Sequence, residues 1–186
     1  MYPKNVKLFD VKIQENVDAY LVPLSPKHLA DIKTFWKHRL DQSLEEDRHW
    51  NWDSKISSKS TINFECYALE CKQITQGLIV LEIDFHRSRI ELSKNLVYVD
   101  YLVTAPWNRP SIQYPPDYKG VGTILFGFAI SRSFDLEYKG RTGLHSLPKA
   151  ENFYRKFKVE DFGKDPDYLN LRYFEISSSS AQKFIS

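Results

Sequence analysis

Hydrophobic residues recur with a helical period between residues 25 and 40, directly after a strand predicted for Asp18 to Leu24. Ser25 and Pro26 are typical of the N-cap and the first position of a helix. The apolar positions that follow have mostly helical spacing: Leu29, Ile32, Phe35, Trp36 and Leu40. Residues 45 to 57 then predict a second, shorter helical or irregular segment.

The middle of the chain changes to the pattern of β-strands. Three runs are rich in β-branched and aromatic residues: Ile62 to Leu69, Gly77 to Phe85 and Leu96 to Thr104. We expect the first two to form a hairpin that turns at Lys72 and Gln73. The third run is nearly all apolar, which indicates a central strand covered on both faces.

The second half of the chain alternates helices and strands again. A proline-rich loop from Ala105 to Tyr118 leads into a helix that opens at Gly120. A short strand, a short helix and a final strand follow, predicted for Thr142 to Ser146, Lys149 to Phe157 and Tyr168 to Ile176. We expect residues 1–12 to add an N-terminal strand or arm, and the serine-rich residues 177–186 to form a flexible tail. The order of elements predicts one mixed α/β domain over residues 1–186.

The composition narrows the class of protein. The 186 residues fit a single domain, and 26 Lys and Arg against 24 Asp and Glu leave a formal net charge of +2. This balance excludes a strongly basic nucleic-acid-binding module but leaves a local basic patch open; we expect no nucleic-acid partner. No apolar run approaches the roughly 18 residues of a membrane helix, and the N-terminal residues do not resemble a signal peptide. Cys66 and Cys71 are interpreted as free thiols of a reducing compartment, so we expect a cytoplasmic protein without a membrane partner.

The start of the helix at Gly120 is the first candidate for chemistry. A helix N-terminus presents unpaired N–H groups and the positive end of the helix dipole, and glycines let a phosphate approach the backbone closely. Lys119, Gly120 and Gly122 therefore fit a diphosphate, although a glycine-rich turn into a packed helix explains the two glycines equally well. The missing lysine before Thr123 excludes a Walker A loop, and Leu125 stands where a dinucleotide fingerprint needs its third small residue.

Two motifs make the chain similar to a known family. The run Lys119 to Gly122 follows the strand end Val103 to Pro106, and further on a strand leads into a helix with Ala150, Phe153 and Tyr154. This arrangement resembles the GNAT-type N-acetyltransferases over most of the chain, from Asp18 to Ile176. The resemblance implies a GNAT-like α/β fold, which is a mixed, mostly antiparallel sheet flanked by helices with a splayed central strand pair.

The resemblance also implies a co-substrate, acetyl-coenzyme A or another acyl-coenzyme A. No His-Glu-x-x-His or His-x-Glu pattern is present, so we expect no catalytic metal. The diphosphate of the coenzyme is expected on the main-chain N–H groups of Lys119, Gly120, Val121, Gly122 and Thr123. Its pantetheine arm is expected along the open edge of Leu102, Val103 and Thr104, where that strand splays from Thr142 to Ser146. The sequence departs from the family signatures at Asp117, which replaces Gln or Arg, and at Leu147, which replaces Asn.

The reaction needs a general base and a general acid, and this requirement identifies the catalytic candidates. A lysine-like amine has a pKa of about 10.4 and must lose a proton to attack, so Asp100 is our first candidate for the general base and Glu82 the second. A substrate-binding or ion-paired carboxylate is an equally good interpretation of Asp100. His145 is a rival base or a structural histidine. By resemblance Tyr154 is the general acid that protonates the leaving thiolate; its alternative role is a core aromatic residue.

The acceptor is expected to carry an amine. Trp50 and Trp52 lie in the segment that often walls the acceptor site of GNAT folds, and with Glu82 and His145 they are our acceptor-binding candidates; core packing explains the two tryptophans equally well. The resemblance predicts transfer of an acyl group, acetyl first, from coenzyme A to an amine of a small molecule, peptide or protein. The alternative is a non-catalytic GNAT-like domain that binds acyl-coenzyme A or a protein partner. Either would be a monomer or a homodimer.

Overall fold

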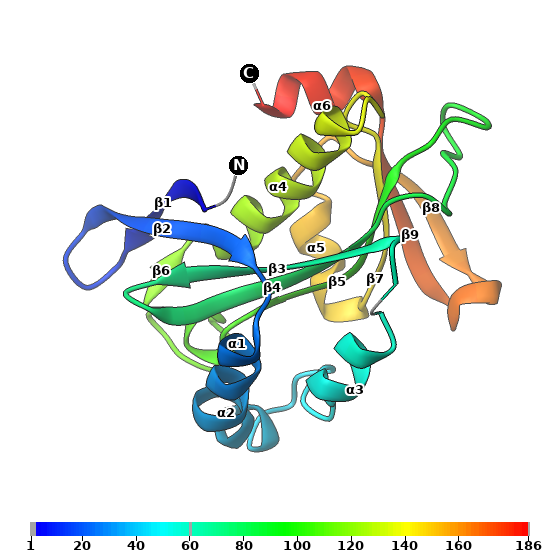
Figure 1. Cartoon of the computed structure of the whole chain (residues 1–186). Coiled ribbons are helices and arrows are strands. Elements are labelled where there is room, and N and C mark those ends of the chain that lie inside the picture. Colours follow the sequence, from blue (N-terminus) through cyan, green and yellow to red (C-terminus); the bar gives the residue numbers. More distant parts are fainter. Residues whose placement is uncertain (1–2, 60, 186) are drawn as a thin grey trace. The chain divides into compact units, whose positions relative to one another are not determined.

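The computed structural model describes residues 3–59 and 61–185, in which strands and helices alternate along the chain (Figure 1). The strands are β1 (Lys4–Asp10), β2 (Glu15–Pro23), β3 (Phe64–Cys71), β4 (Ile74–Glu82), β5 (Val97–Thr104), β6 (Tyr118–Lys119), β7 (Thr142–Ser146), β8 (Glu160–Asp165) and β9 (Leu171–Ile176). The α-helices are α1 (Pro26–Asp31), α2 (Lys37–Asp41), α3 (Trp52–Ser57), α4 (Val121–Asp135), α5 (Glu151–Tyr154) and α6 (Ser178–Ile185). A π-helical segment, η1 (Ile32–Trp36), joins α1 to α2, and three short 3₁₀ helices are η2 (Pro106–Asn108), η3 (Pro148–Ala150) and η4 (Pro166–Tyr168).

The strands form a nine-stranded sheet in the order β6-β1-β2-β3-β4-β5-β7-β9-β8. β5 runs parallel to β7, with Val97–Val99 in register with Thr142–Leu144. The pairs β1–β2, β1–β6, β2–β3, β7–β9 and β8–β9 are antiparallel. The mixed, mostly antiparallel sheet with its helices confirms the predicted α/β fold class. The predicted splay of β5 from β7 beyond this register stays a prediction.

The residues of the chain gather in two compact units. One contains Met1–Val80 and Tyr101–Leu125, and the other contains Leu81–Asp100 and Phe126–Ser186. The expected single domain over residues 1–186 stays a prediction.

The core of the first unit lies where α1, η1 and α2 cover β2, β3 and β4, on the side that also carries α3 (Figure 1). Ile32, Trp36 and Leu40 are buried because their spacing of four residues keeps them on one helix face. Phe35, which the sequence pattern placed in the same stripe, is 44% exposed because it precedes Trp36 by a single residue and faces away. Trp36 meets the ring of Trp107 edge-on, with centroids 6.3 Å apart.

The turn predicted at Lys72 and Gln73 is present between β3 and β4. Both residues have positive φ angles, 50° and 62°, as a tight two-residue hairpin requires. The N-terminal arm is also ordered into the sheet, because β1 pairs with β2 on one side and with β6 on the other. Residues 1 and 2 of that predicted arm lie outside the described residues.

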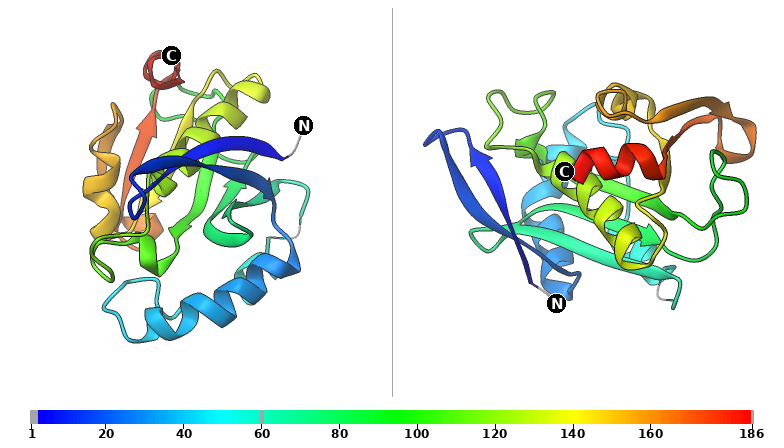
Figure 2. Two further views of the ribbon diagram at one scale, coloured as in Figure 1. Left: turned by 90° about the vertical axis from the view of Figure 1, so that its left-hand side faces the viewer. Right: turned by 90° about the horizontal axis from the view of Figure 1, so that it is seen from above.

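The second unit contains the larger correction to the sequence analysis. Residues 177–186 were expected to be a flexible tail, but most of them form α6, which runs beside α4 (Figure 2). Phe184 packs on Phe126 with ring centroids 5.9 Å apart, and it lies 3.0 Å from the position a Cβ would take at Gly127. The serine run therefore begins a helix, since an apolar face further along it has a partner in α4.

Two further elements differ from the sequence pattern in this unit. The helix expected from Lys149 to Phe157 is reduced to η3 and the four residues of α5. A strand that the sequence analysis did not predict, β8, precedes the final strand and pairs with it. Its sequence, Glu160 to Asp165, is mostly polar because most of its residues are exposed, so it lacks the hydrophobic alternation of a strand.

The long loop after β5 is anchored to the first unit by a buried ion pair. The guanidinium of Arg109 donates to both carboxylate oxygens of Asp47, at 2.7 and 2.8 Å, and its Nε donates to the carbonyl of Thr104 at 2.9 Å. The indole of Trp107 donates to the side chain of Gln76 at 2.8 Å. The side chains of Arg109 and Asp47 are 12% and 6% exposed. Trp107 and Arg109 are therefore tied to the sheet and to residues before α3.

Removing this guanidinium should destabilise the fold strongly. Arg109→Ala leaves the carboxylate of Asp47 buried without its partner, which costs about 3 kcal/mol of unfolding free energy. Urea unfolding measures the loss. The control is Lys7→Ala, which removes the exposed pair with Asp18 and should cost less than about 1 kcal/mol. Similar losses for the two variants would contradict the anchoring role of Arg109.

Candidate functional site

The N-terminus of α4, where the sequence analysis expected a diphosphate site, follows directly after β6. β6 pairs Lys119 with Phe9 of β1, and Gly120 then turns the chain with a φ of +93°, which only glycine adopts easily. Apart from Gly120 and its two chain neighbours, no heavy atom of residues 3–59 and 61–185 lies within 4 Å of the position a Cβ would take at Gly120, so the space beside this turn is open. The first N–H groups of a helix lack partners within it, and the residues therefore fit a diphosphate.

The side chain and the main chain of Asp117 are both held by neighbouring residues. Its carboxylate accepts a hydrogen bond from the side-chain amide of Gln113 at 2.6 Å. Its main chain is also fixed, because its N–H donates to the carbonyl of Trp107 and its carbonyl accepts from Val11, both at 2.9 Å. The departure from the family signature at this position is therefore accommodated by the loop that precedes it.

The segment from Leu102 to Thr104, whose open edge was expected to bind the pantetheine arm, lies next to β4 in the first unit. A Cβ at Gly77 would lie 2.8 Å from the carbonyl oxygen of Val103, so only glycine allows this close approach. Val103 itself is buried, at 6% exposure. The carbonyl of Thr104 already accepts from Arg109, so a pantetheine arm would have to use other main-chain groups of this edge.

Trp50 and Trp52 meet on a third aromatic residue, Tyr101, which the sequence analysis did not single out. The centroid of the Tyr101 ring lies 5.1 Å from that of Trp50 and 5.9 Å from that of Trp52. Trp52 is only 5% exposed and belongs to the core of the first unit. The ammonium of Lys55 lies 4.3 Å from the centroid of Trp50 and 4.1 Å from that of Tyr101. These rings therefore already bind a cation of the chain itself.

Tyr154 lies in the second unit, at the end of α5, and is buried at 5% exposure. Its ring packs against Phe126, Phe153 and Phe174, with centroids 5.6, 5.0 and 6.0 Å away. Burial raises the pKa of its phenol, because the charged form would lose its hydration. The hydroxyl therefore carries its proton at neutral pH, as a proton donor must.

The remaining candidates of the second unit meet around Tyr98. Glu82 lies beside His86, with its Oε1 3.2 Å from Nδ1, and the His86 ring stacks on Tyr98 at a centroid distance of 3.8 Å. The hydroxyl of Tyr98 lies 2.8 Å from Nδ1 of His145. Asp100 shares a strand face with Tyr98, since the two are alternate residues of β5. The structure thus brings together Glu82, Asp100 and His145, which the sequence analysis proposed separately.

The surroundings of Asp165, His145 and Tyr98 set a different protonation state for each side chain. Hydrogen bonds from Arg89 and His145 lower the pKa of Asp165 to about 2, so this carboxyl is ionised at neutral pH. Burial lowers the pKa of His145, although Asp165 opposes the shift, and the imidazole is therefore neutral. Burial and the charge of Asp100 raise the pKa of Tyr98, which keeps its proton.

The loop between β4 and β5, which carries His86 and Arg89, is held by a buried carboxylate. Glu175 on β9 has no exposed surface. Its side chain accepts hydrogen bonds from the hydroxyls of Ser88 and Tyr173 and from the main-chain N–H groups of Arg89 and Ile90. These contacts fix the loop against the sheet of the second unit.

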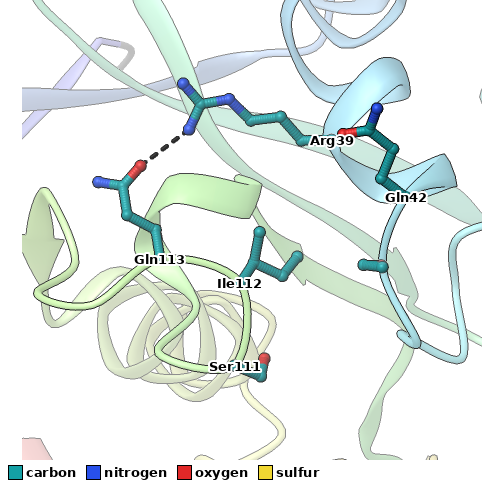
Figure 3. Close-up of a pocket in the computed structure, with 6 residues that line it drawn as sticks. Arg39, Gln42, Ser111, Ile112 and Gln113 are labelled. Carbon is teal, nitrogen blue, oxygen red and sulfur yellow. Dashed lines mark hydrogen bonds between the residues drawn. The ribbon is translucent and has the colours of Figure 1, made fainter.

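A separate pocket of about 410 Å³ lies in the first unit, between the end of α2 and the long loop (Figure 3). The side chain of Arg39 donates to that of Gln113 at 2.8 Å beside it. Gln42, Ser43, Ser111 and Ile112 complete the lining. None of the residues predicted for the site lines this pocket.

Metal-binding clusters and membrane-spanning helices are not found in residues 3–59 and 61–185. In this part of the chain no three or more His, Cys, Asp or Glu side chains are grouped so that they could hold a metal ion. Over the same residues, no helix combines the length and the apolar character needed to span a bilayer.

Comparison with solved structures identifies the fold. Naa50 of Arabidopsis thaliana, in complex with the bisubstrate analogue CoA-Ac-MVNAL, matches with a TM-score of 0.53 and 17% identity, over 87% of this chain and 99% of that one. FeeM, an N-acyl amino acid synthase from uncultured soil microbes, matches with a TM-score of 0.59 and 12% identity, over 89% and 97%. A mutant of the toxin AtaT, bound to the C-terminus of the antitoxin AtaR and to acetyl-CoA, matches with a TM-score of 0.56 and 16% identity, over 90% and 98%.

Comparison of the sequence alone gives no match to a protein-family profile or to a curated protein sequence. The structural matches nevertheless extend over nearly the full length of both partners. The chain therefore has the fold of the GNAT-type N-acetyltransferases.

Proposed function

We propose that the protein transfers an acyl group, with acetyl as the first candidate, from coenzyme A to an amine. The observation that carries this proposal is the open, glycine-led start of α4 after the central strand of a GNAT fold. Two of the structural neighbours were solved with a coenzyme A analogue or acetyl-CoA bound, which supports acyl-coenzyme A as the co-substrate. The acceptor amine belongs to a small molecule, a peptide or a protein.

The residues of the chain would divide this work between holding the donor and moving protons. The N–H groups at Lys119 to Thr123 would bind the diphosphate, and main-chain groups of Leu102 to Thr104 would align the pantetheine arm. When bound, acyl-coenzyme A supplies an acyl group activated as a thioester. Tyr154 would donate a proton to the departing sulfur as the general acid.

The contacts of Lys55 change the role that we propose for the tryptophans in binding the acceptor. Trp50 and Tyr101 offer ring faces to the ammonium of Lys55, so they suit a cationic amine. An acceptor that used these faces would displace Lys55. Trp52 belongs to the core and would pack edge-on against the rings of Trp50 and Tyr101.

Calorimetry and a thiol-release assay test the proposal together. Titration with acetyl-coenzyme A should show binding, and release of free thiol should occur with at least one member of a panel of small amines and peptides. Absence of acetyl-coenzyme A binding would contradict the proposal. Binding without thiol release from any amine of the panel would instead favour a non-catalytic domain that binds the coenzyme.

A further inference from the structure

A continuous hydrogen-bond chain runs from β5 to β8 in the second unit. The hydroxyl of Tyr98 lies 2.8 Å from Nδ1 of His145, and Nε2 of the same ring lies 3.1 Å from a carboxylate oxygen of Asp165. Arg89 donates to that same oxygen from the other side. The side chains of His145 and Asp165 are 3% and 8% exposed, so the chain is shielded from water.

The protons on this chain can be assigned from its donors and acceptors. An ionised carboxylate only accepts hydrogen bonds, so Nε2 of the neutral imidazole must carry the proton that bonds Asp165. Nδ1 then has a free lone pair and accepts the hydroxyl proton of Tyr98. The tyrosine oxygen keeps lone pairs for a further donor. The order of groups is the one found in catalytic triads, with a hydroxyl, a histidine and an orienting carboxylate.

A second histidine and tyrosine pack against the chain without being part of it. His86 stacks on the ring of Tyr98, and Tyr168 stacks on His145 with ring centroids 4.0 Å apart and planes 6° from parallel. The hydroxyl of Tyr168 lies 3.1 Å from Nε2 of His86. Its hydroxyl therefore bonds outside the chain, whereas its ring packs on His145.

We propose that Tyr98, His145 and Asp165 form the proton relay that deprotonates the acceptor amine, an inference that rests on the proposed acyl transfer. The amine gives a proton to the oxygen of Tyr98 as its nitrogen bonds to the acyl carbon. The hydroxyl proton of Tyr98 moves at the same time to Nδ1 of His145. The products are a reformed tyrosine hydroxyl and an imidazolium whose Nε2–H remains on the carboxylate of Asp165. Asp165 and Arg89 are positioning residues, because they orient the imidazole and do not receive the proton.

The relay has a defined dependence on pH. The groups that face His145 come from several elements: Tyr98, Asp165, Tyr168 and Tyr173, with Arg89 and His86 contributing charge. Burial outweighs the attraction of Asp165 and keeps the pKa of His145 below 6.5. The relay needs an unprotonated Nδ1. The turnover rate should therefore reach its full value at pH values above the pKa of His145 and should fall as the pH drops through that pKa.

The first test compares two matched tyrosine variants. Tyr98→Phe keeps the ring on His86 but removes the relay hydroxyl, and should lower kcat roughly 100-fold. Tyr168→Phe keeps the ring on His145 and removes a hydroxyl outside the relay, and should change kcat less than about twofold. Asp165→Asn should lower kcat and move the acid limb of the pH profile to lower pH, because the carboxylate no longer supports the imidazolium.

The second test does not depend on turnover. Proton–nitrogen NMR of the histidine rings near neutral pH should show His145 with its proton on Nε2, and the Asp165→Asn variant should lower the pKa of His145. A proton on Nδ1 would overturn the relay whatever the activity of the protein.

The outcomes separate the relay from the proposed function. If the wild type binds and turns over acetyl-coenzyme A while Tyr98→Phe is as active as Tyr168→Phe, the relay is wrong and the function stands. The same conclusion follows if Asp100→Asn abolishes turnover and Tyr98→Phe does not. If the wild type neither binds nor turns over acetyl-coenzyme A, the proposed function fails, and the relay fails with it.

Discussion

Replacing Gly122 with valine is expected to abolish acetyl-coenzyme A binding. Gly122 lies in the first turn of α4, directly after the turn at Gly120, where the backbone has to come close to the diphosphate. A β-branched side chain there would stand between the phosphate oxygens and the N–H groups. A hydrogen bond to a charged group contributes about 1.5–3 kcal/mol. Loss of two such bonds should raise the Kd at least about 100-fold, which calorimetry would measure.

The control places a valine two residues further along the same helix. Ile124→Val exchanges one β-branched residue for another and leaves both glycines and the open space at Gly120 intact. Its affinity for acetyl-coenzyme A should match that of the wild type. Unchanged affinity in Gly122→Val would move the donor site away from α4, provided that both variants show wild-type thermal unfolding.

Removing the hydroxyl of Tyr154 is expected to separate turnover from binding. Tyr154→Phe keeps the ring among Phe126, Phe153 and Phe174, so packing is preserved. A general acid contributes about 100-fold to 10,000-fold in rate, so kcat should fall by roughly 100-fold at unchanged affinity for acetyl-coenzyme A. Steady-state thiol release and calorimetry on the same preparation give the two quantities.

Tyr138→Phe is the matched control for Tyr154. Tyr138 belongs to the same unit, and its hydroxyl bonds the side chain of Asp84 at 3.4 Å on the surface. Its loss should leave kcat within about twofold of the wild type. Parallel losses of kcat and affinity in Tyr154→Phe would assign Tyr154 a packing role, which was the alternative left open by the sequence.

The elements that the sequence predicted are those with a strong local pattern. β7 was expected from Thr142 to Ser146 and has these bounds, and the helix after Ser25 begins at Pro26. The family resemblance rested partly on Gly120, Gly122 and Tyr154. These residues lie in short motifs at the start of α4 and at the end of α5. Both kinds of signal are short in sequence, so they need no knowledge of tertiary contacts.

The parts that the sequence missed depend on contacts between distant segments. His86 and Tyr168 are 82 residues apart, and Tyr98 and His145 are 47 apart, so no window of sequence contains either pair. Asp165 ends a polar strand that has no hydrophobic alternation. The helix α6 was missed because its serine-rich start favours caps and turns, whereas its stability comes from Phe184 on α4.

The carboxylate of Glu175 limits how far the connection between β4 and β5 can be altered by mutagenesis. Because it fastens the backbone at Arg89 and Ile90, the connection between β4 and β5 behaves as part of the interior and tolerates little redesign there. Randomised libraries should therefore spare residues 88–90 and sample Asp84, Phe85 and Leu92, which are exposed. Diversity confined to those positions leaves the scaffold of the second unit intact while its surface changes.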